Sequence, residues 1–322
     1  MTPARASFPF PDVPLLLTDG GLETTLIYKN GHALPHFASF VLLDDIKGRE
    51  DLRRYYDAYL SVAREHGAGL LLDTPTWRAS ADWGERLGYD EAALRDINLR
   101  AAQFLAALCD RLEGDQPPVA IGGSLGPRGD GYSASECMTP AQSEEYHTPQ
   151  VEALREGGVD FLSALTLTTA AEAIGIARAA QSVRMPAVLS FTVETDGSLP
   201  DGASLAETVD AVDTATDCAP AFYMVNCAHP SHFAHCFETD ASWTSRIGGL
   251  RVNSSKLSHE DLEASTDLDE GNPDELGREI AALCQHLPEA RVFGGCCGTS
   301  PVHIGAMARK VRARQAAPRE SD

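Results

Sequence analysis

"RVFGGCCGTS" (residues 291–300) joins a short apolar run to two adjacent cysteines set among glycines, near the C-terminal end of the printed chain. Seven similar apolar, β-prone runs come before it at fairly even intervals: 14–20, 69–75, 119–126, 161–166, 187–192, 222–227 and 246–252. Apolar residues follow one another in these runs instead of alternating with polar ones, which is typical of strands buried on both faces. The sequence therefore predicts eight buried parallel strands.

Amphipathic helical patterns separate most of these runs. They lie at residues 50–69, 139–161, 168–183, 202–215 and 273–287. Eight strand–helix alternations in about 300 residues predict an α/β fold, a single-domain (β/α)8 TIM barrel. A doubly wound sheet with a small second domain is the alternative. We assign the barrel to residues 14–312, an N-terminal extension to 1–13 and a disordered tail to 313–322.

Composition narrows the range of partners. The chain has 322 residues, 43% of them hydrophobic, and a formal net charge of −21, which argues against nucleic acid or an anionic membrane surface as a partner. No apolar stretch has the length of a signal peptide or of a membrane span, so we predict a cytoplasmic protein. In that reducing compartment the eight cysteines are expected to be free thiols or metal ligands, not disulfides. The oligomeric state is left open.

Polar residues and glycines follow the predicted strands instead of preceding them. They are Asp19-Gly20-Gly21, 74–80, 124–126, Asn226-Cys227 and Cys296-Cys297. In a barrel all of these positions share the C-terminal face, where barrel active sites lie. The longest irregular segments, 127–138, 193–204 and 254–275, also follow strands, as binding loops or lids often do.

Three cysteines at strand ends predict a metal site. Cys227 closes the sixth strand, and Cys296 and Cys297 close the eighth, so the three thiolates converge over one mouth. Both members of the adjacent pair face inward if the strand loses its pleat there, which the flanking glycines permit. Three thiolates suit a tetrahedral zinc ion with one open position. The alternatives are three buried cysteines without a metal, and a second cluster formed by His229, His232, His235 and Cys236.

With these residues in place, the sequence resembles the homocysteine S-methyltransferase family of zinc-dependent barrels from about Leu15 to Ala308. The motifs that carry the resemblance are "DGGLETTL" (19–26), "TPTWRAS" (74–80), "GSLGP" (123–127), "VNCAHP" (225–230) and "GGCCGTSPVHI" (294–304). The resemblance implies that Cys227, Cys296 and Cys297 hold Zn²⁺. It also implies that the acceptor thiol takes the fourth position and attacks a methyl group on a sulfonium or ammonium donor.

The resemblance also implies roles for the residues around the metal. Asp19, Gly20 and Gly21 are expected to contact the acceptor amino acid. Asn226 is expected either to support the zinc-bearing turn or to cap its strand.

The chain departs from the family pattern at several positions. Leu165 stands where the family has a glutamate that pairs with the acceptor's ammonium, although the following Thr166 is kept. Glu23, at a position where the family has a small residue, is a candidate substitute. Arg78 replaces a glutamine or tyrosine, and it either points away or binds a donor carboxylate. Trp77 offers an aromatic face to a cationic donor, or else simply packs beneath its loop.

We therefore predict a zinc-dependent thiol S-methyltransferase with a small-molecule methyl donor and a thiol acceptor. Homocysteine is the default acceptor, giving methionine, and the donor is S-methylmethionine, S-adenosylmethionine or betaine. The alternatives are the same chemistry on another thiol, a non-catalytic zinc-binding barrel, and a dithiol redox enzyme that uses Cys296 and Cys297.

Overall fold

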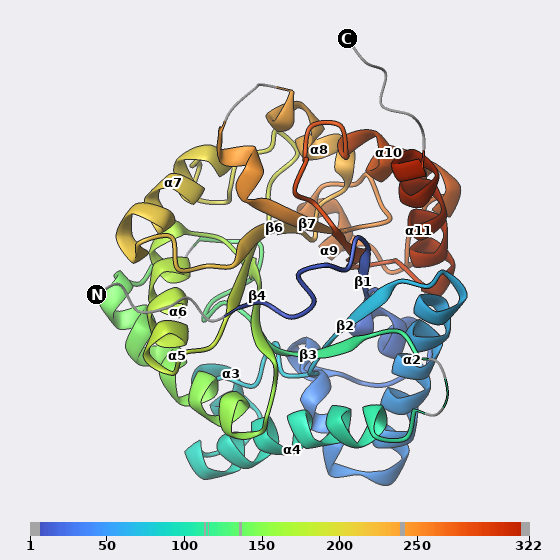
Figure 1. The fold of residues 1–322 in the computed structure, drawn as a ribbon. Helices are drawn as coiled ribbons and strands as arrows, with labels where there is room; N and C mark the ends of the chain where they lie inside the picture. The colour runs from blue at the N-terminus through green and yellow to red at the C-terminus, as the bar shows by residue number, and fades with distance from the viewer. Residues whose placement is uncertain (1–6, 113, 115, 135–136, 239–241, 317–322) are drawn as a thin grey trace.

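The eight apolar runs form one closed parallel barrel in a computed structural model, which describes residues 7–112, 114, 116–134, 137–238 and 242–316 (Figure 1). Each strand pairs with the next in the sequence, and the first pairs with the last. The strands are β1 (Leu16–Thr18), β2 (Gly69–Asp73), β3 (Val119–Leu125), β4 (Phe161–Leu167), β5 (Ala187–Phe191), β6 (Phe222–Asn226), β7 (Ile247–Val252) and β8 (Val292–Gly295). The predicted (β/α)8 barrel is confirmed, and the doubly wound alternative is wrong.

Helices surround the strands in the ribbon of Figure 1. The α-helices are α1 (Leu22–Thr24), α2 (Ile46–Glu65), α3 (Ala81–Arg86), α4 (Glu91–Cys109), α5 (Pro140–Glu156), α6 (Ala170–Ser182), α7 (Leu205–Thr216), α8 (Pro230–Phe233), α9 (His259–Ala264), α10 (Pro273–Leu283) and α11 (Pro301–Ala316). Shorter helical turns are η1 (Thr25–Lys29), η2 (Pro35–Phe37), η3 (Ser39–Asp44), η4 (Ala234–Phe237) and η5 (Ser242–Arg246).

Local sequence signals set several helix starts. Thr139 and Ser204 begin α5 and α7 with capping boxes. In each box the hydroxyl accepts from the backbone N–H three residues later, and the side chain of that later residue accepts from the backbone N–H of the first. All five predicted helical segments contain a helix, whereas α1, α3, α4, α8, α9 and α11 are additional to those predicted. Because α11 reaches Ala316, residues 313–316 of the predicted tail are helical, and 317–322 lie outside the described residues.

Two apolar layers form the core, one between strands and helices and one inside the barrel. The inner layer takes one buried residue from each of seven strands: Leu16, Leu71, Ala120, Phe161, Val188, Met224 and Val292. Phe8 packs edge-on against Phe161 and Phe222, with ring centroids 5.0 and 4.9 Å apart. The described part of the predicted extension, residues 7–13, thus packs against this inner layer, while residues 1–6 lie outside the described part.

The segment 254–275, which contains α9, folds over the C-terminal end of the barrel. Ser254 Oγ donates to the carbonyl of Asp269 at 2.7 Å. His303 Nε2 donates to the backbone carbonyl of Glu270 at 2.8 Å. Lys29 Nζ forms an ion pair with the carboxylate of Glu270, also at 2.8 Å. These bonds tie the segment to α11 and η1, so it forms part of the wall around the mouth. Within the described residues, we find no helix that is both long and apolar enough to cross a membrane.

Candidate functional site

A cavity opens at the C-terminal mouth of the barrel, where the sequence analysis placed the site. The residues that were predicted to form the site all line it: Asp19, Gly20, Gly21, Glu23, Trp77, Arg78, Thr166, Asn226, Cys227, Cys296 and Cys297. Residues that were not predicted line it too, among them Asp73, Tyr132, Arg251 and Leu268. The structure therefore brings together side chains from opposite ends of the chain, because the carboxyl ends of parallel strands meet at one face.

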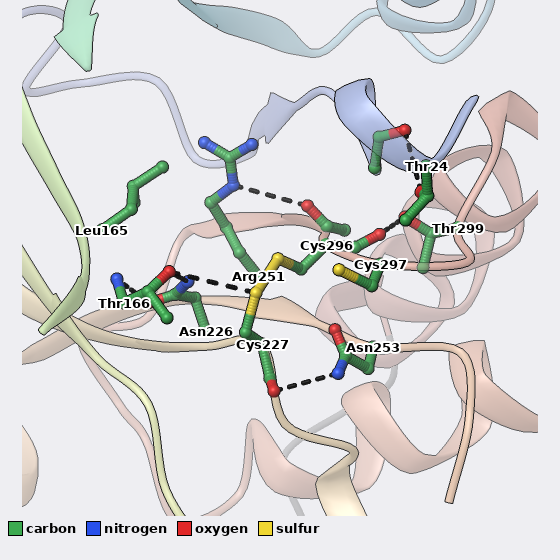
Figure 2. Close-up of a disulfide and its surroundings, with 12 residues drawn as sticks. Thr24, Leu165, Thr166, Asn226, Cys227, Arg251, Asn253, Cys296, Cys297 and Thr299 are labelled. Atoms are coloured by element: carbon green, nitrogen blue, oxygen red, sulfur yellow. Dashed lines mark hydrogen bonds between the residues drawn. A yellow bond between two sulfur atoms is a disulfide. The ribbon is translucent and has the colours of Figure 1, made fainter. Parts of the chain in front are cut away.

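The three predicted metal ligands lie together at the ends of β6 and β8 (Figure 2). The sulfur atoms of Cys227, Cys296 and Cys297 all lie within 4.8 Å of one another. Zinc–sulfur bonds of about 2.3 Å in a tetrahedral site place two sulfur atoms about 3.8 Å apart. The three sulfurs therefore fit a single zinc ion with only small side-chain adjustments.

Cys227 and Cys296 form a disulfide in this structure (Figure 2). The expectation that the cysteines are free thiols or metal ligands is wrong for this pair in this state. The physical reason is proximity, since the two Cα atoms are 5.3 Å apart, within the range that a disulfide requires. Disulfide sulfurs offer no thiolate to a metal, so metal binding by all three cysteines requires the reduced protein.

Cys227 adopts a left-handed backbone conformation that takes its side chain out of the alternation of β6. Its φ is 54°, and the neighbouring Thr166 at the end of β4 has a φ of 62°. Asn226 joins the two turns, because its Oδ1 accepts from Thr166 N and its Nδ2 donates to Thr166 Oγ1, both at 2.9 Å. Non-glycine residues with such φ values are uncommon and cluster at functional sites. This arrangement supports the first of the two roles expected for Asn226.

The carbonyl of Cys227 is fixed from a second direction. Asn253 Nδ2 donates to it at 2.9 Å (Figure 2), and His259 Nε2 donates at 2.8 Å. Asn253 follows β7 and His259 begins α9, so two further elements hold the turn. Neither residue was singled out from the sequence, where an asparagine after a strand is indistinguishable from an ordinary turn residue.

Glycines let the chain segments around the cysteines approach closely. A Cβ atom at Gly21 would lie 2.7 Å from the carbonyl oxygen of Cys296, so a side chain there would push β8 away. Gly298 has a φ of 77°, which L-residues rarely adopt, and it turns the chain from the cysteine pair into α11. The glycine-rich setting thus allows the turn that carries both cysteines.

Cys297 keeps a free thiol beside Tyr132, with 3.8 Å between Sγ and the phenol oxygen. Burial raises the pKa of Cys297 to about 11, and the negative charge of Glu23 acts in the same direction. The hydrogen bond with Tyr132 lowers the pKa only in part. This thiol therefore stays protonated at neutral pH unless a metal ion binds it.

Beneath the cavity, Arg251 on β7 is buried between two aspartates. Its Nη2 lies 2.5 Å from Asp19 Oδ1, and its Nη1 bonds Asp73 Oδ2. Tyr55 donates to the other oxygen of Asp19 at 3.1 Å. Burial raises the pKa of Asp19 to about 7, although the charge of Arg251 lowers it. Both oxygens of Asp19, which was expected to contact the acceptor, thus already have partners within the protein.

The remaining predicted contacts lie on one side of the cavity. Trp77 Nε1 donates to the carbonyl of Leu165 at 3.2 Å, which connects the loop after β2 to β4. The guanidinium carbon of Arg78 lies 3.9 Å from the Trp77 ring centroid, so one face of that indole is already covered by a cation. Leu165 lines the cavity and brings no charge to it.

The histidine-rich segment after β6 does not form the predicted second metal site. Among the described residues, the group of side chains close enough to hold a metal ion is Cys227, Cys296 and Cys297. His229 caps α8 and contacts Glu279, His232 bonds the carbonyl of Lys256, and His235 bonds the carbonyl of Asp196. His235 Nε2 also lies 3.6 Å from Cys236 Sγ, but His229, His232 and His235 otherwise bond different structural partners.

The structure thus defines the class of protein: a (β/α)8 barrel that carries three clustered cysteine sulfurs at its C-terminal face, where the active sites of barrel enzymes lie. Comparison with known proteins specifies the family. The model of the family described as homocysteine S-methyltransferase matches residues 16–311. The chain therefore belongs to the homocysteine S-methyltransferase family, and it is a methyltransferase.

Curated relatives agree with this assignment. The chain is 24% identical over 312 residues to homocysteine S-methyltransferase YbgG of Bacillus subtilis (strain 168), covering 93% of this chain and 95% of the relative. It is 25% identical over 327 residues to homocysteine S-methyltransferase of Escherichia coli (strain K12), covering 95% of this chain and 97% of the relative.

Solved structures share the fold. The oxidized form of the homocysteine methyltransferase MmuM from Escherichia coli superposes with a TM-score of 0.74 at 22% identity, over 93% of this chain and 97% of that chain. The metallated form of the same protein gives a TM-score of 0.68 at 22% identity, with the same coverage.

Proposed function

We propose that this protein is a zinc-dependent thiol S-methyltransferase that methylates homocysteine to methionine. The observation that carries the proposal is the set of three cysteine sulfurs within 4.8 Å of one another, set into the wall of the cavity. Thiolates are ligands that zinc favours, and three of them leave the fourth tetrahedral position for a substrate thiol. We further propose a cytoplasmic location, because a reducing compartment keeps these cysteines as thiols.

Cys227, Cys296 and Cys297 would hold the ion in the reduced protein. Bound zinc would lower the pKa of the acceptor thiol, so that a thiolate is present at neutral pH. In the transfer the acceptor sulfur forms a bond to the methyl carbon, while the bond from that carbon to the donor's sulfur or nitrogen breaks. The donor takes that electron pair and leaves as a neutral thioether or amine, and the acceptor's thiol proton passes to solvent.

The protein's own residues position the reacting groups. Asn226 fixes Cys227 by holding the turn of Thr166, and Asn253 and His259 hold the carbonyl of Cys227. Apolar side chains of the cavity wall, among them Leu165 and Leu268, would exclude water from the methyl group during transfer. The donor is a small sulfonium or ammonium compound, namely S-methylmethionine, S-adenosylmethionine or betaine.

Metal analysis and a transfer assay together test the proposal. Protein purified under reducing conditions should contain one zinc ion per chain and methylate homocysteine with one of the three donors. Cys297→Ala should lose both properties, whereas Cys137→Ala, which changes an exposed cysteine outside the site, should keep both. A reduced, folded protein that binds no metal would rule out the proposed mechanism.

A further inference from the structure

Arg78 is a buried cation at the cavity without a counter-ion of its own. The residue is 5% exposed, and its guanidinium carbon lies 3.9 and 3.8 Å from the ring centroids of Trp77 and Trp83. Nη1 donates to the carbonyl of Gly129 at 2.9 Å, while Nε is buried without a hydrogen-bond partner. Among the described residues, no carboxylate forms an ion pair with it. An unpaired buried cation is costly, so the site suits an anionic ligand group.

Glu23 brings a carboxylate to the same cavity. It follows the Gly20-Gly21 turn, and Ser39 Oγ donates to its Oε1 at 2.8 Å. Burial lowers the pKa of Arg78, and the charges of Asp130 and Glu23 oppose that shift. Glu23 therefore lies in the same cavity as the cysteine centre and favours the charged form of Arg78.

Other charges near the cysteines are already used within the protein. Asp19 is paired with Arg251 and bonded by Tyr55, and Leu165 has no charge. Three further carboxylates line the cavity, those of Asp130, Asp267 and Asp269, but all three residues are exposed. Among the described residues, Glu23 is therefore the cavity carboxylate that is partly buried without an ion pair to Arg251, and it forms no ion pair with Arg78 within 4.0 Å. An α-amino acid carries the complementary charges, an ammonium and a carboxylate on one carbon.

We propose that Glu23 binds the ammonium and Arg78 the carboxylate of the acceptor amino-acid thiol. The proposal rests on the proposed function, because it assumes that a thiol is bound at the three-cysteine centre. The planar guanidinium, held between two indoles, presents a fixed edge to a carboxylate. The pair makes homocysteine recognition compatible with an uncharged Leu165.

Calorimetric titration of reduced, zinc-loaded protein without a methyl donor tests the pair. Three thiols separate the two charges: homocysteine carries both, 4-mercaptobutyrate lacks the ammonium, and homocysteine methyl ester lacks the carboxylate. Arg78→Gln should weaken homocysteine and 4-mercaptobutyrate at least about tenfold and leave the ester unchanged. Glu23→Gln should weaken homocysteine and the ester by a similar factor and leave 4-mercaptobutyrate unchanged.

Arg86→Gln is the matched control, because Arg86 also stacks on Trp83, at 4.4 Å, but is exposed and does not line the cavity. It should change none of the three affinities. If Arg78→Gln weakens the binding of all three thiols equally, the role of Arg78 is structural and the proposal fails. Because the three ligands are compared within one variant, partial unfolding of that variant does not affect the comparison. A wild-type protein that binds zinc and methylates a thiol but prefers 4-mercaptobutyrate to homocysteine would also overturn the pair, while leaving the transferase function intact. Absence of zinc would instead refute the transferase function itself.

Discussion

Replacing Arg251 by methionine should destabilise the barrel strongly, because it leaves two buried carboxylates without their shared cation. Arg251 connects β7 to Asp19 after β1 and to Asp73 at the end of β2. Hydrogen bonds to charged groups contribute about 1.5–3 kcal/mol each, so two of them contribute about 3–6 kcal/mol. Breaking a buried ion pair typically costs about 3–5 kcal/mol, which agrees with that sum. We expect Arg251→Met to lower the free energy of unfolding by about 3–5 kcal/mol at pH 8.

The loss should be smaller at pH 5 than at pH 8. Burial raises the pKa of Asp19 and of Asp73, and the charge of Arg251 opposes both shifts. Without the arginine both folded-state pKa values rise further above the unfolded value of about 3.9. The folded variant then keeps protons that the unfolded chain releases, so its stability falls as pH rises above about 4. At pH 5 the protonated carboxyls are neutral, and their burial without a cation costs less.

Urea unfolding of the reduced, metal-free proteins, followed by circular dichroism at both pH values, measures these differences. Adding Asp19→Asn and Asp73→Asn to Arg251→Met should recover most of the stability, because no buried charge is left. Arg95→Met, which breaks an exposed ion pair with Glu156, should cost at most about 1 kcal/mol. A loss below about 1 kcal/mol for Arg251→Met, or an equal loss at pH 5 and pH 8, would refute this reasoning.

Three further outcomes are expected. Mild oxidation should form the Cys227–Cys296 disulfide and release zinc, and a phosphine reductant with added zinc should regenerate the two thiols and restore metal binding; zinc that stays bound while thiol titration shows two thiols lost would contradict this. Asn226→Ala should weaken zinc affinity about tenfold or more in chelator competition, because residues that orient metal ligands contribute 10–100-fold; unchanged affinity would show that the turn holds without it. Leu165→Glu should weaken homocysteine binding in calorimetry, since the new carboxylate would pair with Arg78 and compete with the substrate, and unchanged or tighter binding would contradict the link between the two positions.

The barrel was predictable because its strands carry a strong local signal. Each of the eight runs is apolar enough to be buried on both faces, and strand β2 is buried at every position from Gly69 to Asp73. The positions of Cys227, Cys296 and Cys297 at strand ends then followed from the topology alone, since parallel strands in a barrel end at one face. The reduced or oxidised state of these cysteines has no such signal, because it depends on the surroundings of the protein as well as on its sequence.

Arg251 shows what the sequence did not reveal. It lies in the apolar run "RIGGLRV", and its partners Asp19 and Asp73 are 232 and 178 residues away. In the sequence each is an isolated charge at the end of a strand, which is usually a solvated residue. Closure of the barrel brings the three together out of water, and only then does their pairing become a requirement for stability.

The departures from the family pattern at Leu165 and Arg78 are physically connected, although they lie 87 positions apart in the sequence. Trp77 forms the connection, because its indole nitrogen bonds the carbonyl of Leu165 and its ring stacks on Arg78. A glutamate at 165 would place a carboxylate on the same wall as an unpaired guanidinium, and the two opposite charges would attract each other across a poorly solvated cavity. Such a pair would compete with a substrate for both charges. An uncharged Leu165 leaves Arg78 available to a ligand. Relative to the family pattern, the lost glutamate at 165 and the gained arginine at 78 are therefore consistent with a single change in the charge of the cavity.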